Sequence, residues 1–238
     1  STPGVLQQGN SNLVSEKNHS FALTYNFFAA RFSTSWKLRH SFTNNSIESV
    51  TTLVNDNDIS GVKNPTGKMV NYDTYYNIGK TQTTSLSGYI SWTIFKNTRL
   101  YMNTWVDYSD YNDRQSLHNY GWYGSLYMNL EQTLPKDWQI SAGFSGWTSN
   151  PGLQSKSQGN NYYSLSLRKS MLKKRLTISL FANSFLQKEN RYKNTRHGSN
   201  FTYNSDFYRS APNFGINLSL RLGELTSGVK KAMKTKEN

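Results

Sequence analysis

Apolar and polar side chains alternate with a period of two along most of this 238-residue chain, and this alternation restricts the fold more than any other feature. Residues 85–108 show the pattern that the rest of the chain repeats. The first half of this segment places Leu86, Ile90 and Trp92 on one face of an extended strand and puts serine and threonine on the other. The second half repeats the alternation after a short polar turn. The segment is therefore predicted to be a β-hairpin.

The register of this hairpin follows from matching apolar side chains across the two strands. Ile94 is expected opposite Leu100 and Phe95 opposite Arg99, because a slip of one residue would move every side chain to the wrong face. This pairing leaves a three-residue loop in which Asn97 takes the left-handed conformation.

The polar face of the hairpin mixes arginine, asparagine and aspartate with large aromatic side chains such as Tyr101 and Trp105. Two architectures accept such a face. In a soluble β-sandwich the apolar face would fill the core and the polar face would meet solvent. In a transmembrane β-barrel the apolar face would meet lipid and the polar face would line a hydrated lumen.

The connections between strands alternate between short and long, which favours the barrel. The nine expected strands are residues 21–28, 31–54, 69–95, 99–108, 122–131, 138–145, 163–168, 175–183 and 214–222. The long connections are residues 55–68, 109–119, 148–159 and 187–210. Outer-membrane barrels have short turns on the periplasmic side and long loops outside, whereas the crossovers of a sandwich follow no such rule.

Strand length and strand number point to the same architecture. Most strands have about ten residues or more, as a tilted membrane strand requires, and Trp122 and Trp138 lie near opposite strand ends, where aromatic girdles would be. An odd number of strands that ends on the short-turn side indicates nine C-terminal strands of a larger barrel. We assign an all-β, transmembrane antiparallel β-barrel to residues 19–222. Residues 1–18 are expected to end an external loop, and residues 223–238 to form a basic periplasmic tail.

Charge and composition limit the chemistry. The formal net charge of +13 suggests an anionic partner, but the basic residues are scattered along the strands, which argues against nucleic acid. There is no cysteine, and no catalytic motif is present. The histidines are isolated, so we expect no metal, no cofactor and no enzymatic activity. Residues 55–68 are interpreted as an Asx-rich turn; a calcium loop is the alternative, but Gly67 stands where it would need glutamate.

Strand parity assigns side chains to the two faces of the wall. The predicted lumen-lining or substrate-contacting residues are Arg31, Lys37, Arg39, Arg99, Tyr101, Trp105, Tyr123, Tyr127, Arg168 and Arg175. The predicted lipid-facing residues are Trp36, Ile90, Trp92, Met128, Trp138, Ile178 and Leu218, of which Ile90, Met128, Ile178 and Leu218 are expected near the bilayer midplane. The basic side chains either balance acids in a hydrated wall or bias passage toward anionic solutes. The aromatic side chains either stack on sugars or aromatic ligands or pack on a plug.

Two short stretches resemble a known family. Residues 9–17 read Gly-Asn-Ser-Asn-Leu-Val-Ser-Glu-Lys and resemble the Gly-Asn-Pro-x-Leu-x-Pro-Glu signature that precedes late barrel strands in TonB-dependent receptors, with Ser11 and Ser15 in place of proline. Residues 213–223, followed by Val-Lys-Lys, are similar to the end of the Bacteroidota branch of these outer-membrane barrels, although the last strand ends at Leu222 without a terminal aromatic residue.

The resemblance implies the C-terminal barrel portion of a TonB-dependent receptor-like member of the outer-membrane β-barrel family. It implies a 22-stranded barrel in the outer membrane of a Gram-negative bacterium, closed by an N-terminal plug and energised through TonB for uptake of a solute. The implied partners are outer-membrane lipid and lipopolysaccharide, the plug and the remaining strands, TonB and a surface lipoprotein. The alternative is a secreted, aromatic-rich β-sandwich module that binds glycans.

The loop lengths predict the orientation of the wall. Residues 96–97, 135–136 and 173–174 should lie in the periplasm, and residues 55–68 and 187–210 outside the cell. Protease applied to intact cells is expected to cut only the second set, as read by mass spectrometry of the released peptides. Cleavage at the short turns instead would contradict this topology.

Overall fold

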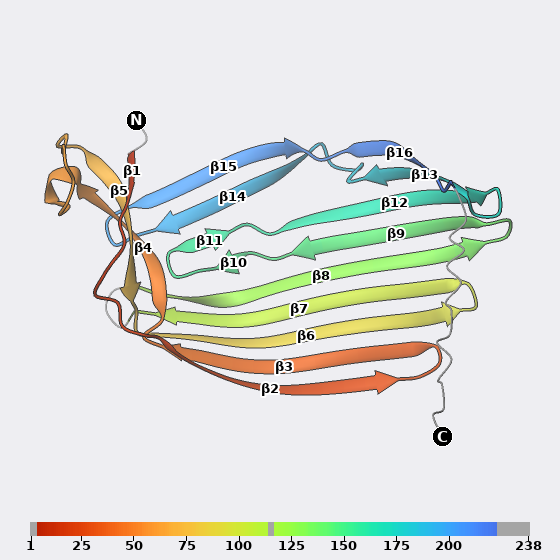
Figure 1. The fold of residues 1–238 in the computed structure, drawn as a ribbon, viewed down its shortest axis with the longest axis horizontal. Helices are drawn as coiled ribbons and strands as arrows, with labels where there is room; N and C mark the ends of the chain where they lie inside the picture. Colours follow the sequence, from red (N-terminus) through yellow and green to blue (C-terminus); the bar gives the residue numbers. More distant parts are fainter. Residues whose placement is uncertain (1–3, 114–116, 223–238) are drawn as a thin grey trace, which may run out of the picture.

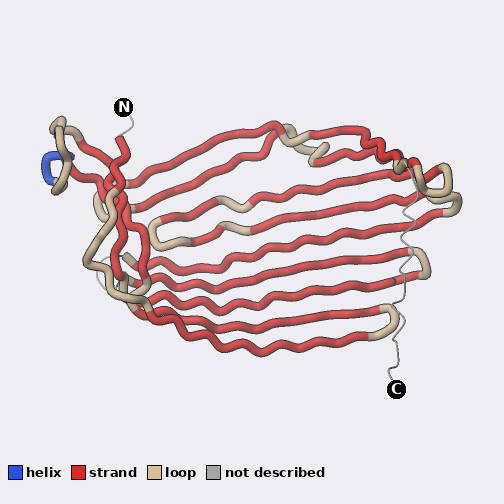
Figure 2. The backbone as a smooth tube through the Cα atoms, viewed as in Figure 1, coloured by secondary structure: helices blue, strands red, loops and turns tan. Residues whose placement is uncertain are grey.

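The computed structural model describes residues 4–113 and 117–222, which form mainly antiparallel β-structure (Figure 1, Figure 2). Its main element is a nine-stranded sheet in the order β16-β13-β12-β9-β8-β7-β6-β3-β2. The strands of this sheet are β2 (Lys17–Phe28), β3 (Phe32–Asn44), β6 (Lys80–Phe95), β7 (Thr98–Asn112), β8 (His118–Leu134), β9 (Trp138–Trp147), β12 (Asn160–Met171), β13 (Leu176–Asn183) and β16 (Asn213–Leu220). Each of them overlaps one of the nine segments expected from the alternation.

The sheet is a meander, in which neighbouring strands are also consecutive in sequence once the loop elements are set aside. The turns that join β2 to β3, β6 to β7, β8 to β9 and β12 to β13 lie together at the right in Figure 1, and we call this the short-turn end. The longer connections leave from the opposite, long-loop end. The alternation of loop lengths in the sequence therefore corresponds to the two ends of one wall.

Pairing between the strands keeps the two faces of the wall chemically distinct. One face, which we call the apolar face, contains the paired row Thr34, Ile90, Met102, Met128 and Phe144. The next row belongs to the polar face and contains Ser33, Ser91, Tyr101, Asn129 and Gly143. On the two outermost strands, Leu23 and Ile216 of the apolar face are 71% and 73% exposed. The apolar face is thus left open to its surroundings.

Aromatic side chains form a band at each end of the apolar face. At the short-turn end Phe32 meets Trp92 edge to face, with ring centroids 6.3 Å apart. At the long-loop end Tyr108 packs on Trp122, with ring centroids 5.1 Å apart. Leu100 pairs with Trp92, and about 27 Å of strand separates Leu100 from Tyr108, or about 20 Å of height at a tilt of about 40°. This height is close to that of the apolar band of a membrane barrel.

Trp36 lies on the apolar face, as predicted, and its position depends on a glycine. Its cross-strand neighbour is Gly88. A Cβ atom at residue 88 would stand 2.4 Å from Cζ3 of Trp36, so the indole lies over space that only glycine leaves free. Any larger residue at this position would push the ring away from the sheet.

The predicted register of the β6–β7 hairpin is wrong by two residues. In the structure Trp92 pairs with Leu100 and Thr93 with Arg99, and a β-bulge then shifts the register so that Phe95 pairs with Thr98. The bulge leaves a two-residue turn, and Asn97 does not have a positive φ. A shift of two residues preserves the faces of the strand. The bulge alone moves Phe95 to the apolar face, where it is 68% exposed and extends the aromatic band.

The first long connection contains strands that the sequence prediction placed in the wall. Between β3 and β6, β4 (Ile47–Asn55), the 3-10 helix η1 (Asp56–Asp58) and β5 (Met69–Asn77) are followed by a break at Ile78 and Gly79. β4 and β5 form a separate three-stranded sheet with β1 (Gly4–Gln7), which runs parallel to β5. The expected strands 31–54 and 69–95 are therefore each two strands, and Asn45 turns the chain after β3 with a φ of 53°. Residues 1–18, expected to be loop, include β1 and the start of β2.

The third and fourth long connections are also more ordered than predicted. They contain β10 (Asn150–Pro151), β11 (Ser155–Ser157), β14 (Glu189–His197) and β15 (Thr202–Ser210), which form a four-stranded sheet. Its order, β10-β11-β14-β15, repeats that of β9-β12-β13-β16, so each short strand continues a wall strand outward (Figure 1). The main-chain N–H of Gln158 donates to the carbonyl of Lys193 and connects the two sides of this extension. The wall therefore continues past the long-loop end.

This architecture does not fit the secreted β-sandwich. A sandwich buries one face of each sheet against a second sheet, whereas the apolar face here is exposed across the wall. Within residues 4–113 and 117–222, no helix is long and apolar enough to cross a membrane. The sheet is not closed, because β2 and β16 are its two edges. The predicted tail at residues 223–238 lies outside the described residues.

Two residues expected near the midplane lie closer to one end. Ile178 pairs with both Lys169 and Leu218, and Lys169 also pairs with Trp138. Ile178 and Leu218 are therefore on the apolar face, as predicted, but beside the aromatic band of the short-turn end. Ile90 lies between the two bands.

The adjacent residues Ile90 and Ser91 offer a direct test of the two faces. In the full-length barrel refolded into bilayers, Ile90→Arg should lower the free energy of unfolding by roughly 2 to 4 kcal/mol, because it places a charge against hydrocarbon. Ser91→Arg should have little effect. Ile90→Ala should cost far less than the roughly 2 to 5 kcal/mol of a cavity in a packed core, because lipid fills the space. Urea titrations measure all three changes, and equal penalties for the two arginine variants would contradict the assignment of faces.

Candidate functional site

Three of the four long connections meet in a small hydrophobic core at the long-loop end of the wall. Val50 of β4, Ile78 before β6 and Leu153 between β10 and β11 are buried together. Tyr111, near the end of β7, and Leu117, just before β8, pack against them. We call the elements that lie outside the nine-stranded sheet, which are β1, β4, β5, η1, β10, β11, β14 and β15, the loop cap. The first three connections contribute to this core, and Arg196 of the fourth bonds to Thr51 of β4, so the four connections are joined in the loop cap.

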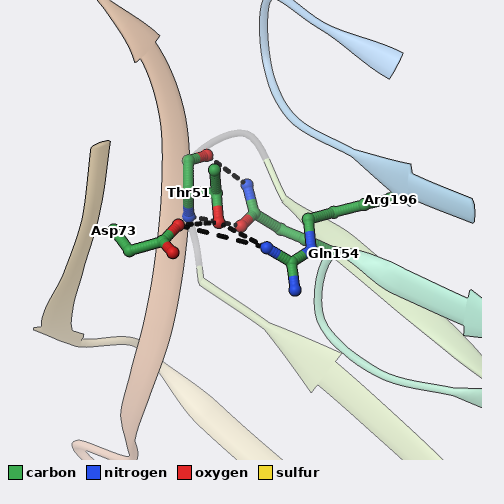
Figure 3. A network of polar contacts seen from close by, with 4 residues as sticks. All are labelled: Thr51, Asp73, Gln154 and Arg196. Carbon is green, nitrogen blue, oxygen red and sulfur yellow. Dashed lines mark hydrogen bonds and ion pairs between the residues drawn. The ribbon is translucent and has the colours of Figure 1, made fainter. Parts of the chain in front are cut away.

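A polar network reinforces the loop cap at the same point (Figure 3). The side chain of Gln154 accepts a hydrogen bond from the main-chain N–H of Thr51 at 2.8 Å and donates to the Thr51 carbonyl at 3.0 Å. It therefore completes both main-chain hydrogen bonds of a residue 103 positions away in sequence. The Thr51 hydroxyl donates to the Asp73 carboxylate and accepts from Nη1 of Arg196 at 3.1 Å. The network thus ties β4 and β5 to the third and fourth connections.

A second contact of the same kind lies nearby. Asn200, in the turn between β14 and β15, donates from Nδ2 to the carbonyl of Leu53 at 2.7 Å. Its Oδ1 accepts from the Leu53 N–H at 3.4 Å. Side-chain amides therefore pair twice with the free edge of β4. At both positions the side-chain amide forms the hydrogen bonds that the backbone of a neighbouring strand would form. The loops are therefore linked to β4 without extending its sheet.

Residues 55–68 form a turn organised by one carboxylate. The Asp56 carboxylate accepts hydrogen bonds from the N–H and hydroxyl of Thr66 and from the N–H groups of Gly67 and Lys68, at 2.7 to 3.1 Å. The N–H of Thr66 contributes most to lowering the pKa of Asp56, and the other three donors lower it further. The Asx-rich turn is therefore confirmed. The Asp56 carboxylate accepts hydrogen bonds from nearby groups of the same chain, as is typical of a structural turn.

The β14–β15 hairpin is held by contacts across its two strands. Arg191 forms a bidentate ion pair with Asp206, with N–O distances of 3.0 and 2.9 Å, and this lowers the pKa of the Asp206 carboxyl. The rings of Tyr192 and Phe207 stack with centroids 4.7 Å apart. Bidentate pairs of this type fix geometry as well as charge. The hairpin is thus a defined platform, although the sequence predicts a loop at residues 187–210.

A cavity of about 240 Å³ lies where the four connections converge. Thr52 and Tyr76 line it from the first connection, Asp113 from the second, Gln154 from the third and Ser199 from the fourth. The lining combines hydroxyl, amide and carboxylate groups with the apolar side chains of Val50, Ile78 and Leu117, so the cavity suits a small molecule with polar and apolar parts. It lies directly beside the polar network of Figure 3, because Gln154 belongs to both.

The polar face of the wall contains a larger hollow of about 470 Å³. Its aromatic lining is formed by Tyr89, Trp105, Tyr127 and Trp147, with Lys37 as its charged group. Serines at positions 35, 87, 125 and 145 separate these rings and leave space between them. The indole N–H of Trp105 donates to the Asp107 carboxylate, which holds the ring in place. The result is an aromatic surface with one ammonium group and many hydroxyls.

The structure brings together only part of the predicted lumen set. Lys37, Trp105 and Tyr127 line the hollow. Arg39, Arg99, Tyr101, Tyr123 and Arg168 lie on the same polar face but outside the hollow. Arg31 and Arg175 are in the short turns that precede β3 and β13, so strand parity does not assign them to a face. Tyr89 and Trp147 were missed, although their odd positions could have identified them.

Two acids on the polar face, Asp107 and Glu131, are missing from the predicted lumen set. Glu131 stands directly opposite Arg99, and its Oε1 accepts from Nδ2 of Asn129 at 3.1 Å. Asp107 pairs across the ladder with Ser85 and Tyr123. Acids within this stretch therefore balance part of the basic charge, which favours the hydrated wall over a strongly anion-selective one. The odd sequence positions of Asp107 and Glu131 would have been enough to assign both to the polar face.

The predicted lipid-facing residues share the apolar face without exception. Trp36, Ile90, Trp92, Met128, Trp138, Ile178 and Leu218 are related by direct cross-strand pairing or by even spacing along a strand. Across the part of the chain that the structure describes, no group of three or more His, Asp or Glu side chains is placed to hold a metal ion. The site therefore consists of the loop cap and the polar-face hollow.

Comparison with known proteins agrees with this architecture. Residues 1–220 match the model of the outer membrane protein beta-barrel family, and the chain belongs to that family. No curated protein and no solved structure matches the chain. Family membership places the wall in the outer membrane of a Gram-negative bacterium and assigns its strands as transmembrane strands.

Gln154→Ala tests whether the polar network holds the loop cap together. The change leaves the N–H and carbonyl of Thr51 without partners, at a cost of about 1 to 3 kcal/mol. Hydrogen exchange at the Thr51 amide should then accelerate about 5- to 150-fold. The exposed Gln158 is the matched control, and Gln158→Ala should leave this rate unchanged. An unaltered rate in Gln154→Ala would show that other contacts hold the loop cap.

Proposed function

We propose that this chain forms part of the wall and the outer opening of a TonB-dependent receptor-like transporter that takes up a solute. The observation that carries the proposal is the hollow on the polar face, which combines aromatic rings, hydroxyls and one ammonium group. In a barrel this face is the lumen. An aromatic surface rich in hydroxyls serves for contact with a solute, because rings stack on apolar faces while hydroxyls exchange hydrogen bonds.

The loop cap supports a role in selective uptake. The first three connections share a hydrophobic core, and a polar network joins the fourth connection to them, so the loops at this end are ordered. The cavity of about 240 Å³ at their meeting point offers polar groups to an arriving solute. We infer that a solute first meets the loop cap and then the aromatic hollow of the wall. Ordered loops that contact ligands are a common arrangement on rigid scaffolds.

The two open edges support a larger barrel. In a bilayer the N–H and C=O groups of an edge strand need partners, because no water is available at that depth. β2 and β16 would each have to pair with a further strand, and we propose a complete barrel of about 22 strands around an N-terminal plug, energised by TonB. We also propose a surface lipoprotein as a partner at β15, an edge strand that presents exposed Tyr203, Phe207 and Tyr208.

Uptake measurements on cells that carry only the full-length barrel test this function. A panel of labelled oligosaccharides, peptides and metal chelates first identifies the transported class. The double variant Trp105→Ala/Tyr127→Ala should then lower uptake about tenfold, because each aromatic contact contributes about 0.5 to 1.5 kcal/mol. Tyr108→Ala, on the apolar face, is the matched control and should not change it.

A second arm separates energised from passive transport. Uptake should stop when TonB is deleted or when the proton gradient is collapsed. Uptake that continues under both conditions would reject the energised mechanism and leave a passive channel. Unchanged uptake in the Trp105→Ala/Tyr127→Ala variant would remove the hollow from the transport path.

A further inference from the structure

Basic side chains are distributed very unequally between the two ends of the wall. At the short-turn end, residues 28–33, 93–99, 131–139, 168–177 and 219–222 contain the basic residues Arg31, Lys96, Arg99, Lys136, Arg168, Lys169, Lys173, Lys174, Arg175 and Arg221. The same ranges contain only two acids, Glu131 and Asp137. At the long-loop end basic residues and acids are present in similar numbers, and ion pairs such as Arg191–Asp206 and Arg196–Asp73 join them. The basic residues are scattered along the sequence, but the fold concentrates the positive charge of the described wall at the short-turn end.

Two neighbouring turns carry the centre of this charge. β9 pairs with β12, so the β8–β9 turn with Lys136 lies beside the β12–β13 turn with Lys173 and Lys174. Lys169 lies between them on the apolar face, with Nζ 5.1 Å from the centroid of the Trp138 ring. Its ammonium group donates to the carbonyl of Lys136. An ammonium has three donors, so this group still has donors to offer to a ligand.

The backbone of both turns has an uncommon conformation for the residues it contains. Lys136, Lys173 and Lys174 have φ values of 61°, 55° and 67°. This left-handed region favours glycine and asparagine, and it carries a cost for lysine. Turn geometry therefore does not explain why lysine stands at these positions. Asp137 and Leu172 in the same turns also have positive φ, so the conformation is not specific to lysine, and the argument for these lysines rests on their shared position and charge.

We propose that the rim formed by Lys136, Lys169, Lys173 and Lys174 binds the phosphate groups of anionic phospholipids in the periplasmic leaflet. Short turns of such barrels lie on the periplasmic side. At this level Trp138 belongs to the aromatic band that meets the headgroup region, and Lys169 stacked on it has its charge at headgroup height. The exposed Leu172 in the same turn offers an apolar contact beside the charges. A lipid matches this combination of ammonium groups and apolar surface better than a free phosphate ion.

The test measures lipid preference of the full-length barrel in detergent by native mass spectrometry. Phosphatidylglycerol should bind in preference to phosphatidylcholine. The short-turn variant replaces Lys136, Lys169, Lys173 and Lys174 by glutamine and should reduce this preference at least tenfold, because each basic residue near an anionic surface contributes about fivefold. The matched long-loop variant replaces the exposed Lys63, Lys68, Lys156 and Lys188 by glutamine, with the same change in net charge, and should retain the preference.

Arginine variants, a folding check and competition with phosphate complete the test. Arginine at the four short-turn positions should retain the preference, and the heat-dependent gel shift of folded barrels verifies that each variant is folded. No preference in the unmodified protein, or an equal loss in the long-loop variant, would overturn the proposal. Complete displacement of phosphatidylglycerol by millimolar inorganic phosphate would also overturn it, because the rim would then be a site for a free anion. None of these readouts depends on transport.

Discussion

Backbone hydrogen bonds between adjacent strands hold this wall together, and the rest of the structure depends on them. The buried hydrophobic residues of the described chain are Val50, Ile59, Ile78, Leu153 and Ala211, and all of them lie in the long connections. The nine-stranded sheet thus has no hydrophobic core of its own. In a bilayer the ladder is the only way to satisfy N–H and C=O groups at depth, so the side chains are free to adapt one face to lipid and the other to water.

The loop cap differs from the wall in having a hydrophobic core, because it lies where water competes for every hydrogen bond. It has a small core of Val50, Ile78 and Leu153 and relies on side-chain amides for its longest links. Gln154 and Asn200 each pair with both main-chain groups of one residue of β4, which gives an irregular loop the pairing of a strand. Two kinds of stabilisation therefore meet at the long-loop end. The wall consists of hydrogen-bonded strands without a core, and the loop cap combines two small sheets with a compact core.

Strand parity explains how much of this structure could be predicted. Because side chains alternate strictly, the sequence suffices to place Trp36, Met128 and Leu218 on one face and Lys37 and Trp105 on the other. The register of the strands is harder to predict from sequence, since a shift of two residues leaves every side chain on the same face. In the β6–β7 hairpin, the predicted and observed registers differ in this way, and only Phe95 changes face, because of the bulge. The loop cap could not be predicted, because β14 and β15 lack clean alternation and their contacts to β4 join residues up to 147 positions apart.

The loop cap also links connections that lie apart in the sheet. Thr51 belongs to the connection between β3 and β6, and Gln154 to that between β9 and β12, so β7 and β8 lie between the two in the sheet. A flat sheet would hold these connections several strand spacings of about 4.8 Å apart. Their direct contact requires the connections to fold over the long-loop end of the sheet. Because this contact joins connections on the two sides of β7 and β8, it fixes them over the ends of these strands, and a change in one connection must be accommodated by the other.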